Sequence, residues 1–247
     1  PVFSGSLGVT DRIRFADHYH YFDSGAEKYV IGFAVENGMF DVCNWLGQPT
    51  GVGAGDLLSV QEILHSRRPT RVIAVNQPPG MVSYIESVLS LLGNAAARLV
   101  CVGVSSQDIR GGHDNSRRII SGRTCDPATL DAVRRALEAE TEVFVVFQPD
   151  PGDDLPVESI RAYMDYVSLG SFMLITRTAF GQPWIGYSRN WTRRAIQQLT
   201  SPDSEFRVDH SWERQIITAC PWGYLRRVSA KPLHHGQHIP IDDLDLI

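Results

Sequence analysis

The sequence lacks the long apolar runs of a membrane protein and the excess of basic residues that nucleic-acid-binding proteins carry. No apolar run approaches the roughly 20 residues that span a bilayer. The formal net charge is −5 at pH 7, which disfavours broad electrostatic binding to nucleic acid. The start of the chain, Pro1-Val2-Phe3-Ser4, has no signal-peptide pattern. We therefore expect neither a membrane nor a nucleic acid among the partners.

Cysteine is scarce and dispersed. Cys43, Cys101, Cys125 and Cys220 are the four cysteines, and no two of them form a C-x-x-C pair. This pattern favours reduced thiols in a cytoplasmic protein, several of them on buried strands, over a disulfide, which is the less favoured alternative.

Apolar runs and amphipathic segments alternate through the middle of the chain. The 247 residues, 43% hydrophobic and 21% charged, suffice for one good-sized α/β domain. Strands are predicted over 72–75, 99–104, 118–120, 143–147 and 172–175, with helices over 57–65, 81–92, 127–137, 156–167 and 191–200. Residues 206–209 and 215–220 suggest a closing antiparallel pair. The prediction is a mostly parallel seven-stranded sheet with helices on both faces.

The chain divides into three parts on this interpretation. Residues 1–66 form an N-terminal helical or lid segment, 67–230 a Rossmann-like core, and 231–247 a C-terminal tail. In the first part, the aromatic run at 11–23 either packs a lid onto the core or lines a pocket with side chains such as His20 and Tyr21. In the tail, the histidines at 234, 235 and 238 are interpreted as incidental, so no metal site is predicted there.

The stretch Arg71–Gly93 has the order strand, turn, helix that α/β proteins use to bind nucleotide-like cofactors. The turn, Asn76-Gln77-Pro78-Pro79-Gly80, is poor in glycine for that purpose. Ligands in open α/β sheets bind beyond the carboxyl ends of the strands. The segments to consider are therefore 76–80, 103–105, 148–154 and 176–180.

A second glycine-rich stretch, Gly51-Val52-Gly53-Ala54-Gly55, resembles a cofactor loop but follows no buried strand. We interpret it as a flexible connection, with Asp56 as the N-cap of the next helix.

Several motifs, in this order, resemble the cephalosporin hydroxylase and rhamnosyl O-methyltransferase family, which has a class I methyltransferase fold. They are Trp45-Leu46-Gly47-x-Pro49, Asp56, Gln61-Glu62-Ile63, Gly122-x-x-x-Asp126-Pro127, Gly170-Ser171-Phe172, Phe206-x-Val208-Asp209 and Pro221-x-Gly223-Tyr224-Leu225-Arg226-Arg227. The resemblance covers most of the chain. It implies the same fold, a role in antibiotic biosynthesis, and substrate binding near Trp45 and Asp56.

The positions that carry the family's chemistry depart from this resemblance. Of its Glu-Thr-Gly loop and Gly-Gly-Ser turn, only Gly80 remains, and Gly103 stands where an acidic residue would hold the ribose of S-adenosylmethionine. Of the metal ligands, Asp150 remains, while Thr176-Arg177 replaces a Glu-Asp pair and Pro151 a histidine. One carboxylate beside a guanidinium does not make a Mg²⁺ site. The prediction is a degenerate member without cofactor or metal, with a filled slot at Asn76–Gly80.

Three functions remain open from the sequence. The leading hypothesis is ring closure with loss of an anionic leaving group, as in methyltransferase-like proteins of aziridine-forming (azinomycin-type) pathways. Asp150 would act as base and Arg177 as anion clamp, although the two residues equally suit a structural ion pair. The alternatives are a non-catalytic subunit of an active homologue and S-adenosylmethionine-dependent O-methylation of a sugar or polyketide hydroxyl. The expected partners are a small, anionic biosynthetic intermediate and a second methyltransferase-like chain, or a second copy of this one.

Overall fold

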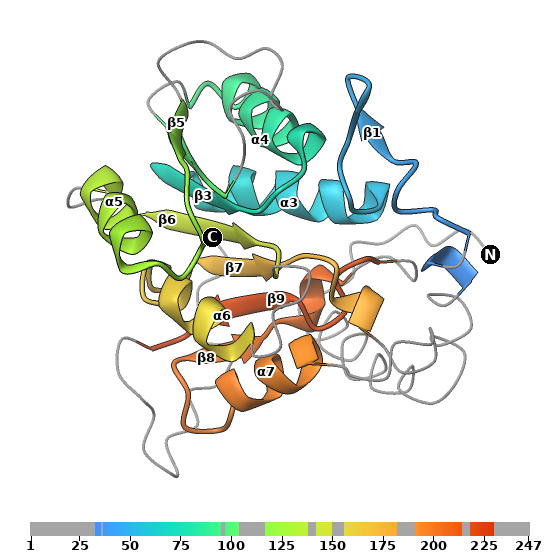
Figure 1. The fold of residues 1–247 in the computed structure, drawn as a ribbon. Helices are drawn as coiled ribbons and strands as arrows, with labels where there is room; N and C mark the ends of the chain where they lie inside the picture. Colours follow the sequence, from blue (N-terminus) through green and yellow to red (C-terminus); the bar gives the residue numbers. More distant parts are fainter. Residues whose placement is uncertain are drawn as a thin grey trace, which may run out of the picture.

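A seven-stranded sheet forms the centre of the protein (Figure 1). The computed structural model describes residues 33–35, 37–94, 97–103, 117–137, 142–149, 156–181, 191–213 and 218–229. The strand order is β5-β4-β3-β6-β7-β9-β8. The strands are β3 (Arg71–Val75), β4 (Arg98–Val102), β5 (Arg117–Ile120), β6 (Val143–Phe147), β7 (Phe172–Ile175), β8 (Phe206–Val208) and β9 (Tyr224–Arg227).

The five strands β5, β4, β3, β6 and β7 are parallel to one another, and β9 pairs antiparallel with both β7 and β8. This confirms the predicted mostly parallel sheet with an antiparallel pair at its end. The predicted position of the last strand is wrong, because β9 is Tyr224–Arg227 and the described residues Thr218–Cys220 form no strand. The amides of Ala219 and Cys220 donate to the side chains of Asp56 and Thr218 instead of to a sheet ladder.

Helices cover both faces of the sheet (Figure 1). α3 (Ala54–Arg67) and α4 (Pro79–Leu91) pack with Val72, Ala74 and other side chains of one face. α5 (Pro127–Leu137), α6 (Pro156–Met164) and α7 (Trp191–Leu199) pack with Ile73, Val75 and other side chains of the opposite face. Because successive strand residues point to opposite faces, a central strand such as β3 must be apolar throughout.

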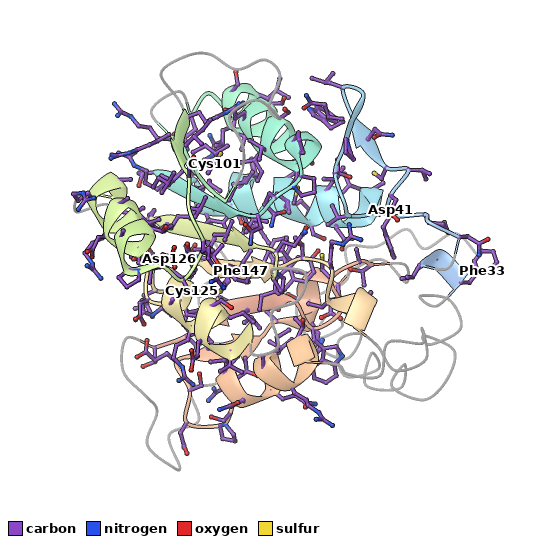
Figure 2. The ribbon with its side chains drawn as sticks, in the orientation of Figure 1. Phe33, Asp41, Cys101, Cys125, Asp126 and Phe147 are labelled. Atoms are coloured by element: carbon purple, nitrogen blue, oxygen red, sulfur yellow. The ribbon has the colours of Figure 1, made fainter. Side chains whose placement is uncertain are left out.

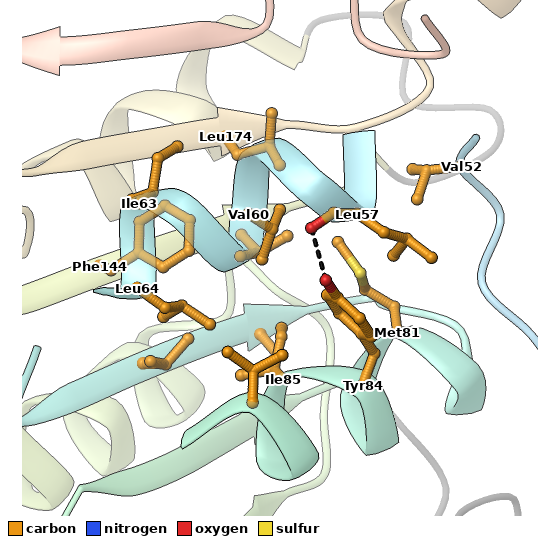
Figure 3. Close-up of a cluster of buried hydrophobic side chains, with 14 of the residues drawn as sticks. Val52, Leu57, Val60, Ile63, Leu64, Met81, Tyr84, Ile85, Phe144 and Leu174 are labelled. Carbon is orange, nitrogen blue, oxygen red and sulfur yellow. Dashed lines mark hydrogen bonds between the residues drawn. The ribbon is translucent and has the colours of Figure 1, made fainter. Parts of the chain in front are cut away.

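Figure 3 shows the packing between α3, α4 and the sheet. Val60, Ile63 and Ile85 are completely buried there, and full burial of such side chains contributes about 1.5–3 kcal/mol each. The Tyr84 hydroxyl donates a 2.6 Å hydrogen bond to the carbonyl of Leu57, and burial raises the pKa of Tyr84 to about 12. α3 thus belongs to the main core, although the sequence placed it in the N-terminal segment.

The start of α3 differs from its prediction. The helix begins at Ala54, and Gly53 is its N-cap. Asp56 is therefore the third helical residue and not the N-cap. Its Oδ2 accepts the Gly53 amide at 3.1 Å, which is the backward half of a capping box.

A small hairpin precedes α3, formed by β1 (Asn44–Trp45) and β2 (Gln48–Pro49). Its two central residues, Leu46 and Gly47, both have positive φ, at 50° and 78°. Two such residues in a row produce the tight twisted turn that joins antiparallel strands.

All four cysteines are free thiols. Cys101 is buried in β4, whereas Cys125 lies exposed beside Asp126 at the start of α5 (Figure 2). Burial raises the pKa of Cys101 to about 12. Among the helices that the structure describes, none combines the length and apolar character of a membrane span.

Candidate functional site

The loops that follow four neighbouring strands meet at the carboxyl edge of the sheet. The first residue after each strand continues the ladder by donating its amide to the next strand's carbonyl. These contacts are Asn76 to Val102 (2.9 Å), Gly103 to Ile120 (3.2 Å), Gln148 to Val75 (3.0 Å) and Thr176 to Phe147 (2.8 Å). The structure therefore brings the predicted segments at 76–80, 103, 148 and 176–177 together at one edge.

The side chain of Asn76 lies across this edge. Its Nδ2 donates to the carbonyl of Gln148 at 3.3 Å. Its Oδ1 lies 2.0 Å from the point where a Cβ on Gly103 would be. Gly103 also has φ +74°, which disfavours residues with a Cβ. Position 103 is thus glycine for two local reasons, and Asn76 fills the space into which an acidic side chain at 103 would extend.

The turn after β3 is closed by its neighbours. A Cβ on Gly80 would lie 2.2 Å from the carbonyl oxygen of Gln48, and one on Gly51 would lie 2.9 Å from Cγ of Pro78. Pro79 has no amide hydrogen, and Met81 donates its amide to Pro78 at 3.0 Å. Few amides remain at the start of α4 to bind an anionic ligand.

Met81, the residue after the turn, does not contribute to its closure. Its side chain is completely buried and lies in the core near Tyr84 and Leu57 (Figure 3). The closure of the turn comes from the hairpin and from residues 51 and 78 instead.

The stretch 51–55 is not the flexible connection that its glycines suggested. Thr50, Gly51 and Val52 are buried. The Thr50 hydroxyl donates to the carbonyls of Cys43 (2.9 Å) and Val52 (3.0 Å). Gly51, with φ +69°, packs on Pro78 at close range. Its small size permits this packing.

Trp45 packs the hairpin onto α4. Its indole N–H donates to the Ser87 hydroxyl at 3.2 Å, and its ring meets Tyr84 edge-on with centroids 5.0 Å apart. Beside it, the Ser83 hydroxyl donates to the side-chain carbonyl of Gln48 at 3.0 Å. The polar atom of Trp45 is thus engaged by the protein, at a position predicted to bind substrate.

Asp56, the other such position within the described residues, lies in the core with 1% of its surface exposed. Besides Gly53, its carboxylate accepts hydrogen bonds from the Thr218 hydroxyl, the Ala219 amide (2.9 Å) and the Tyr224 hydroxyl (3.2 Å). Burial raises the pKa of Asp56, and the four hydrogen bonds partly oppose that rise. The residue joins α3 to β9 and to the segment before it.

Arg177 has φ +60° and directs its Nη1 to Oδ1 of Asp41 at 3.5 Å. The two side chains are 30% and 59% exposed, respectively. The Nη1 atom also lies 3.6 Å from the Cβ position of Gly51. Asp41 was not predicted, because nothing in the sequence connects it to a residue 136 positions away.

Two amide side chains in this edge carry buried oxygens without a partner. Oε1 of Gln77 and Oε1 of Gln148 are buried and accept no hydrogen bond. The orientation of Gln77 is fixed, because its Nε2 donates to the Val75 carbonyl (3.0 Å) and to the Thr176 hydroxyl (3.3 Å). Unsatisfied buried acceptors are costly, so these two oxygens destabilise the edge as it stands in this structure.

A second group at the carboxyl edge was missed from the sequence. Nδ1 of His210 lies 3.1 Å from Oε1 of Glu213. The same carboxylate oxygen accepts the Trp222 amide at 2.8 Å, and the His210 and Trp222 rings meet edge-on at 4.9 Å. The short 3-10 turn η4 (His210–Trp212), capped by Asp209, places the histidine.

Several predicted residues lie outside the part of the chain that the structure describes. These are Asp150, His20, Tyr21 and the histidines near the C-terminus. Among the described residues, no three His, Cys, Asp or Glu side chains are arranged to hold a metal ion.

The sheet order, with one antiparallel strand inserted beside β7 and helices on both faces, defines a class I methyltransferase fold. The family described as rhamnosyl O-methyltransferase/CmcI matches residues 37–228. The chain belongs to this family.

Solved structures of CmcI share the fold. An apo form aligns with a TM-score of 0.54 and 13% identity over 77% of this chain and 78% of the other. A form titled Mg-SAM aligns with a TM-score of 0.55 and 10% identity over the same shares. An SAH form aligns with a TM-score of 0.54 and 12% identity over 77% and 84%. At these identities the likeness establishes the fold alone. Comparison with curated proteins gives no significant match.

Proposed function

We propose that this family member has lost the binding mode for S-adenosylmethionine and acts in natural-product biosynthesis as a ring-closing enzyme. One observation carries the proposal. The Asn76 amide occupies the space above Gly103, at the position where the resemblance to the family expects a ribose-binding acid. Gly103, the residue at that position, offers no carboxylate to the ribose hydroxyls of the cofactor.

The residues around the turn support the same interpretation. Gly80 is packed against the backbone of Gln48, and Pro78 against Gly51. The residue pair expected to bind Mg²⁺ is Thr176-Arg177, in which Thr176 is buried and bonded to Gln77. A hydroxyl and a guanidinium do not bind a hard divalent cation, which prefers several oxygen ligands. This set of side chains does not fit S-adenosylmethionine with Mg²⁺.

The guanidinium of Arg177 favours binding of an anionic substrate at the position where the family would bind Mg²⁺. A guanidinium recognises carboxylate, phosphate or sulfate with directed donors. In the proposed step, a base takes a proton from a substrate amine or hydroxyl, which attacks the neighbouring carbon. The bond from that carbon to an ester oxygen breaks, and the anion leaves with the electron pair. Asp150 is the proposed base and Arg177 the proposed anion ligand.

The side-chain oxygens of Gln77 and Gln148 are candidate acceptors for the amine or hydroxyl nucleophile of such a substrate. Both oxygens are buried in this structure, so the proposal requires that the edge opens when substrate binds and presents them to an amine or hydroxyl nucleophile. Binding the nucleophile and the leaving anion of one substrate at the same edge would restrict their motion, which favours an intramolecular reaction.

A partner subunit is part of the proposal. Apolar side chains are exposed in the segment before β1 and in the β1–β2 turn, including Val42 at 72% and Leu46 at 80%. Exposed apolar residues in one stretch favour a protein contact. Copurification with a second methyltransferase-like chain, or a homodimer that L46E disrupts, would support this part. A monodisperse monomer that is unaffected by L46E would count against it.

The function is tested in two steps. Calorimetry with S-adenosylmethionine at millimolar concentration should give no heat of binding and no rise in melting temperature. Incubation with vicinal amino sulfate and amino phosphate esters should then release the anion and a cyclic amine, detected by ion chromatography and mass spectrometry. Binding of S-adenosylmethionine together with methyl transfer would overturn the proposal.

O-methylation of a sugar or polyketide hydroxyl is the second candidate. The observation that favours it is the family match over residues 37–228, and the neighbour with the 0.55 TM-score is titled as a Mg-SAM form. The O-methylation hypothesis predicts saturable binding of S-adenosylmethionine, whereas the ring-closure hypothesis predicts no binding.

A further inference from the structure

Two arginines share one aromatic ring at the amino edge of the sheet, opposite the candidate site. Arg67 ends α3, Arg226 lies in β9, and Phe172 begins β7. The Cζ atom of each arginine lies 5.8 Å from the centroid of the Phe172 ring. Phe172 and Arg226 are direct neighbours in the β7–β9 register. Phe172 is itself almost completely buried, so the ring is a fixed support for two partly buried cations.

Neither guanidinium forms an ion pair or a side-chain hydrogen bond with any residue in the described ranges. Arg227, which follows Arg226, does form an ion pair, with Glu205. Nε of Arg226 is buried and has no acceptor. The guanidinium of the adjacent Arg227 donates hydrogen bonds from all three nitrogens. Nε and Nη2 donate to the Glu205 carboxylate, and Nη1 donates to the carbonyl of Val167. Packing on a ring satisfies a face of a guanidinium but none of its five donors.

Among the described residues, Asp209 is the carboxylate that acts on the charge of Arg226, and one of its oxygens is already engaged elsewhere. Oδ1 of Asp209 accepts the Ser211 amide at 3.1 Å and the Ser211 hydroxyl at 2.5 Å. Burial and the positive charge of Arg67 lower the pKa of Arg226, and Asp209 opposes this only in part. Two partly buried cations in mutual repulsion, one with an unsatisfied buried donor, are stabilised by an anion between them.

The backbone beside Arg67 shapes the same place. Gly170 has φ +78°, and a Cβ there would lie 3.5 Å from Nη1 of Arg67. Its amide donates to the Arg227 carbonyl at 2.8 Å, which fixes the turn that leads into Phe172. The guanidinium of Arg67 therefore lies over an ordered turn, so both of its neighbours, the ring and the turn, are fixed.

We infer that Arg67 and Arg226, supported by Phe172, form a second binding site for a tetrahedral oxyanion, either free phosphate or sulfate or the ester of a larger metabolite. Guanidinium forks match the oxygens of such anions. The site lies at the opposite end of β7 from Arg177, so it does not depend on the proposed ring closure.

The test is calorimetric titration of the whole chain with sodium phosphate and sodium sulfate, at an ionic strength matched with sodium chloride. We expect saturable binding that weakens at least tenfold in Arg67→Gln and in Arg226→Gln. Arg98→Gln, an exposed arginine that begins β4 at the same edge, should bind as the unchanged protein does. No binding, or equal binding in all four proteins, would overturn the inference.

A second ligand and a second variant of Arg226 complete the test. Phenyl phosphate that binds more tightly than phosphate indicates an esterified ligand, and the reverse indicates a free anion. If Arg226→Gln fails to fold by circular dichroism, Arg226→Lys retains the charge and should keep partial binding. The test then depends on Arg67→Gln at the end of α3. If this variant binds phosphate and sulfate with unchanged affinity, the proposed site is refuted.

Discussion

The side-chain oxygen of Asn76 lies 2.0 Å from the point that a Cβ atom on Gly103 would occupy. The two residues follow neighbouring parallel strands, β3 and β4, and meet because both strands end at the same edge. Asn76 takes a positive φ of 51° to reach that place, a conformation that asparagine tolerates better than most residues. Asn76 therefore occupies the space beside Gly103, where the resemblance to the family expects an acidic side chain.

Restoring an acid at position 103 should destabilise the protein. Gly103→Asp introduces a Cβ that collides with Asn76 and forces φ +74° on a non-glycine residue. We expect a loss of about 1–3 kcal/mol in the free energy of unfolding. In urea denaturation, the added Asn76→Gly change should recover part of the loss. Strictly additive effects of the two substitutions would show that they do not meet.

Asp56 should contribute a stability term that is largest at acid pH. Its pKa in the folded protein is raised above the ordinary 3.8, chiefly by burial. The folded state thus holds the proton more tightly than the unfolded state, so the contribution is fully present below pH 3.8. It is lost as the pH rises through the raised folded pKa.

The measurement is the difference in unfolding free energy between the unchanged protein and Asp56→Asn, followed from acid to neutral pH. The advantage of the unchanged protein should shrink as the pH rises. At neutral pH, Asp56→Asn should still cost about 1–3 kcal/mol, because an amide NH₂ would face donors such as Ala219 N–H. A difference that grows with pH would mean that the four hydrogen bonds outweigh burial.

Variants of Arg177 and Asp41 should show whether Arg177 has a structural role or binds an anion. The pair is partly exposed and 3.5 Å apart, so its loss should change stability by no more than about 1 kcal/mol. If Arg177 binds the leaving anion, Arg177→Gln should lower turnover by about 10²–10³. Asp41→Asn should preserve turnover, because it removes only the charge of Asp41 and leaves the guanidinium of Arg177 in the protein. Equal losses in both variants would assign the pair a structural role.

The Arg117–Glu86 pair should hold the edge strand β5 to α4. Arg117 Nε donates to Glu86 Oε1 at 2.6 Å, and Nη2 contacts the other oxygen. With side chains only 11% and 16% exposed, breaking the pair by Glu86→Gln should cost about 3–5 kcal/mol. The double change Glu86→Leu and Arg117→Met should cost clearly less in thermal unfolding. Arg134→Gln, which breaks the exposed pair with Asp131, serves as control and should have little effect.

The class of fold was predictable because its signal is local. Strands buried on both faces must be continuously apolar, as in Val143–Phe147, and amphipathic helices between them imply parallel crossovers. The same local logic located the candidate edge at the residues after 75, 102, 147 and 175. It also indicated the family, since the motifs keep their order along the chain. It failed at Thr218–Cys220, where an apolar run gives its amides to Asp56 and to a hydroxyl.

The amino-acid sequence by itself determined most of the strands and helices and the mostly parallel class of the sheet, and its resemblance to the family indicated departures at acidic and glycine positions. Only the tertiary structure decided what stands in their place: Asn76 over Gly103, the hairpin on Gly80, and Asp41 beside Arg177. The physical reason is the range of the interactions. Periodicity and turn chemistry act between residues a few positions apart, whereas these contacts join segments that only the packed sheet and helices bring together.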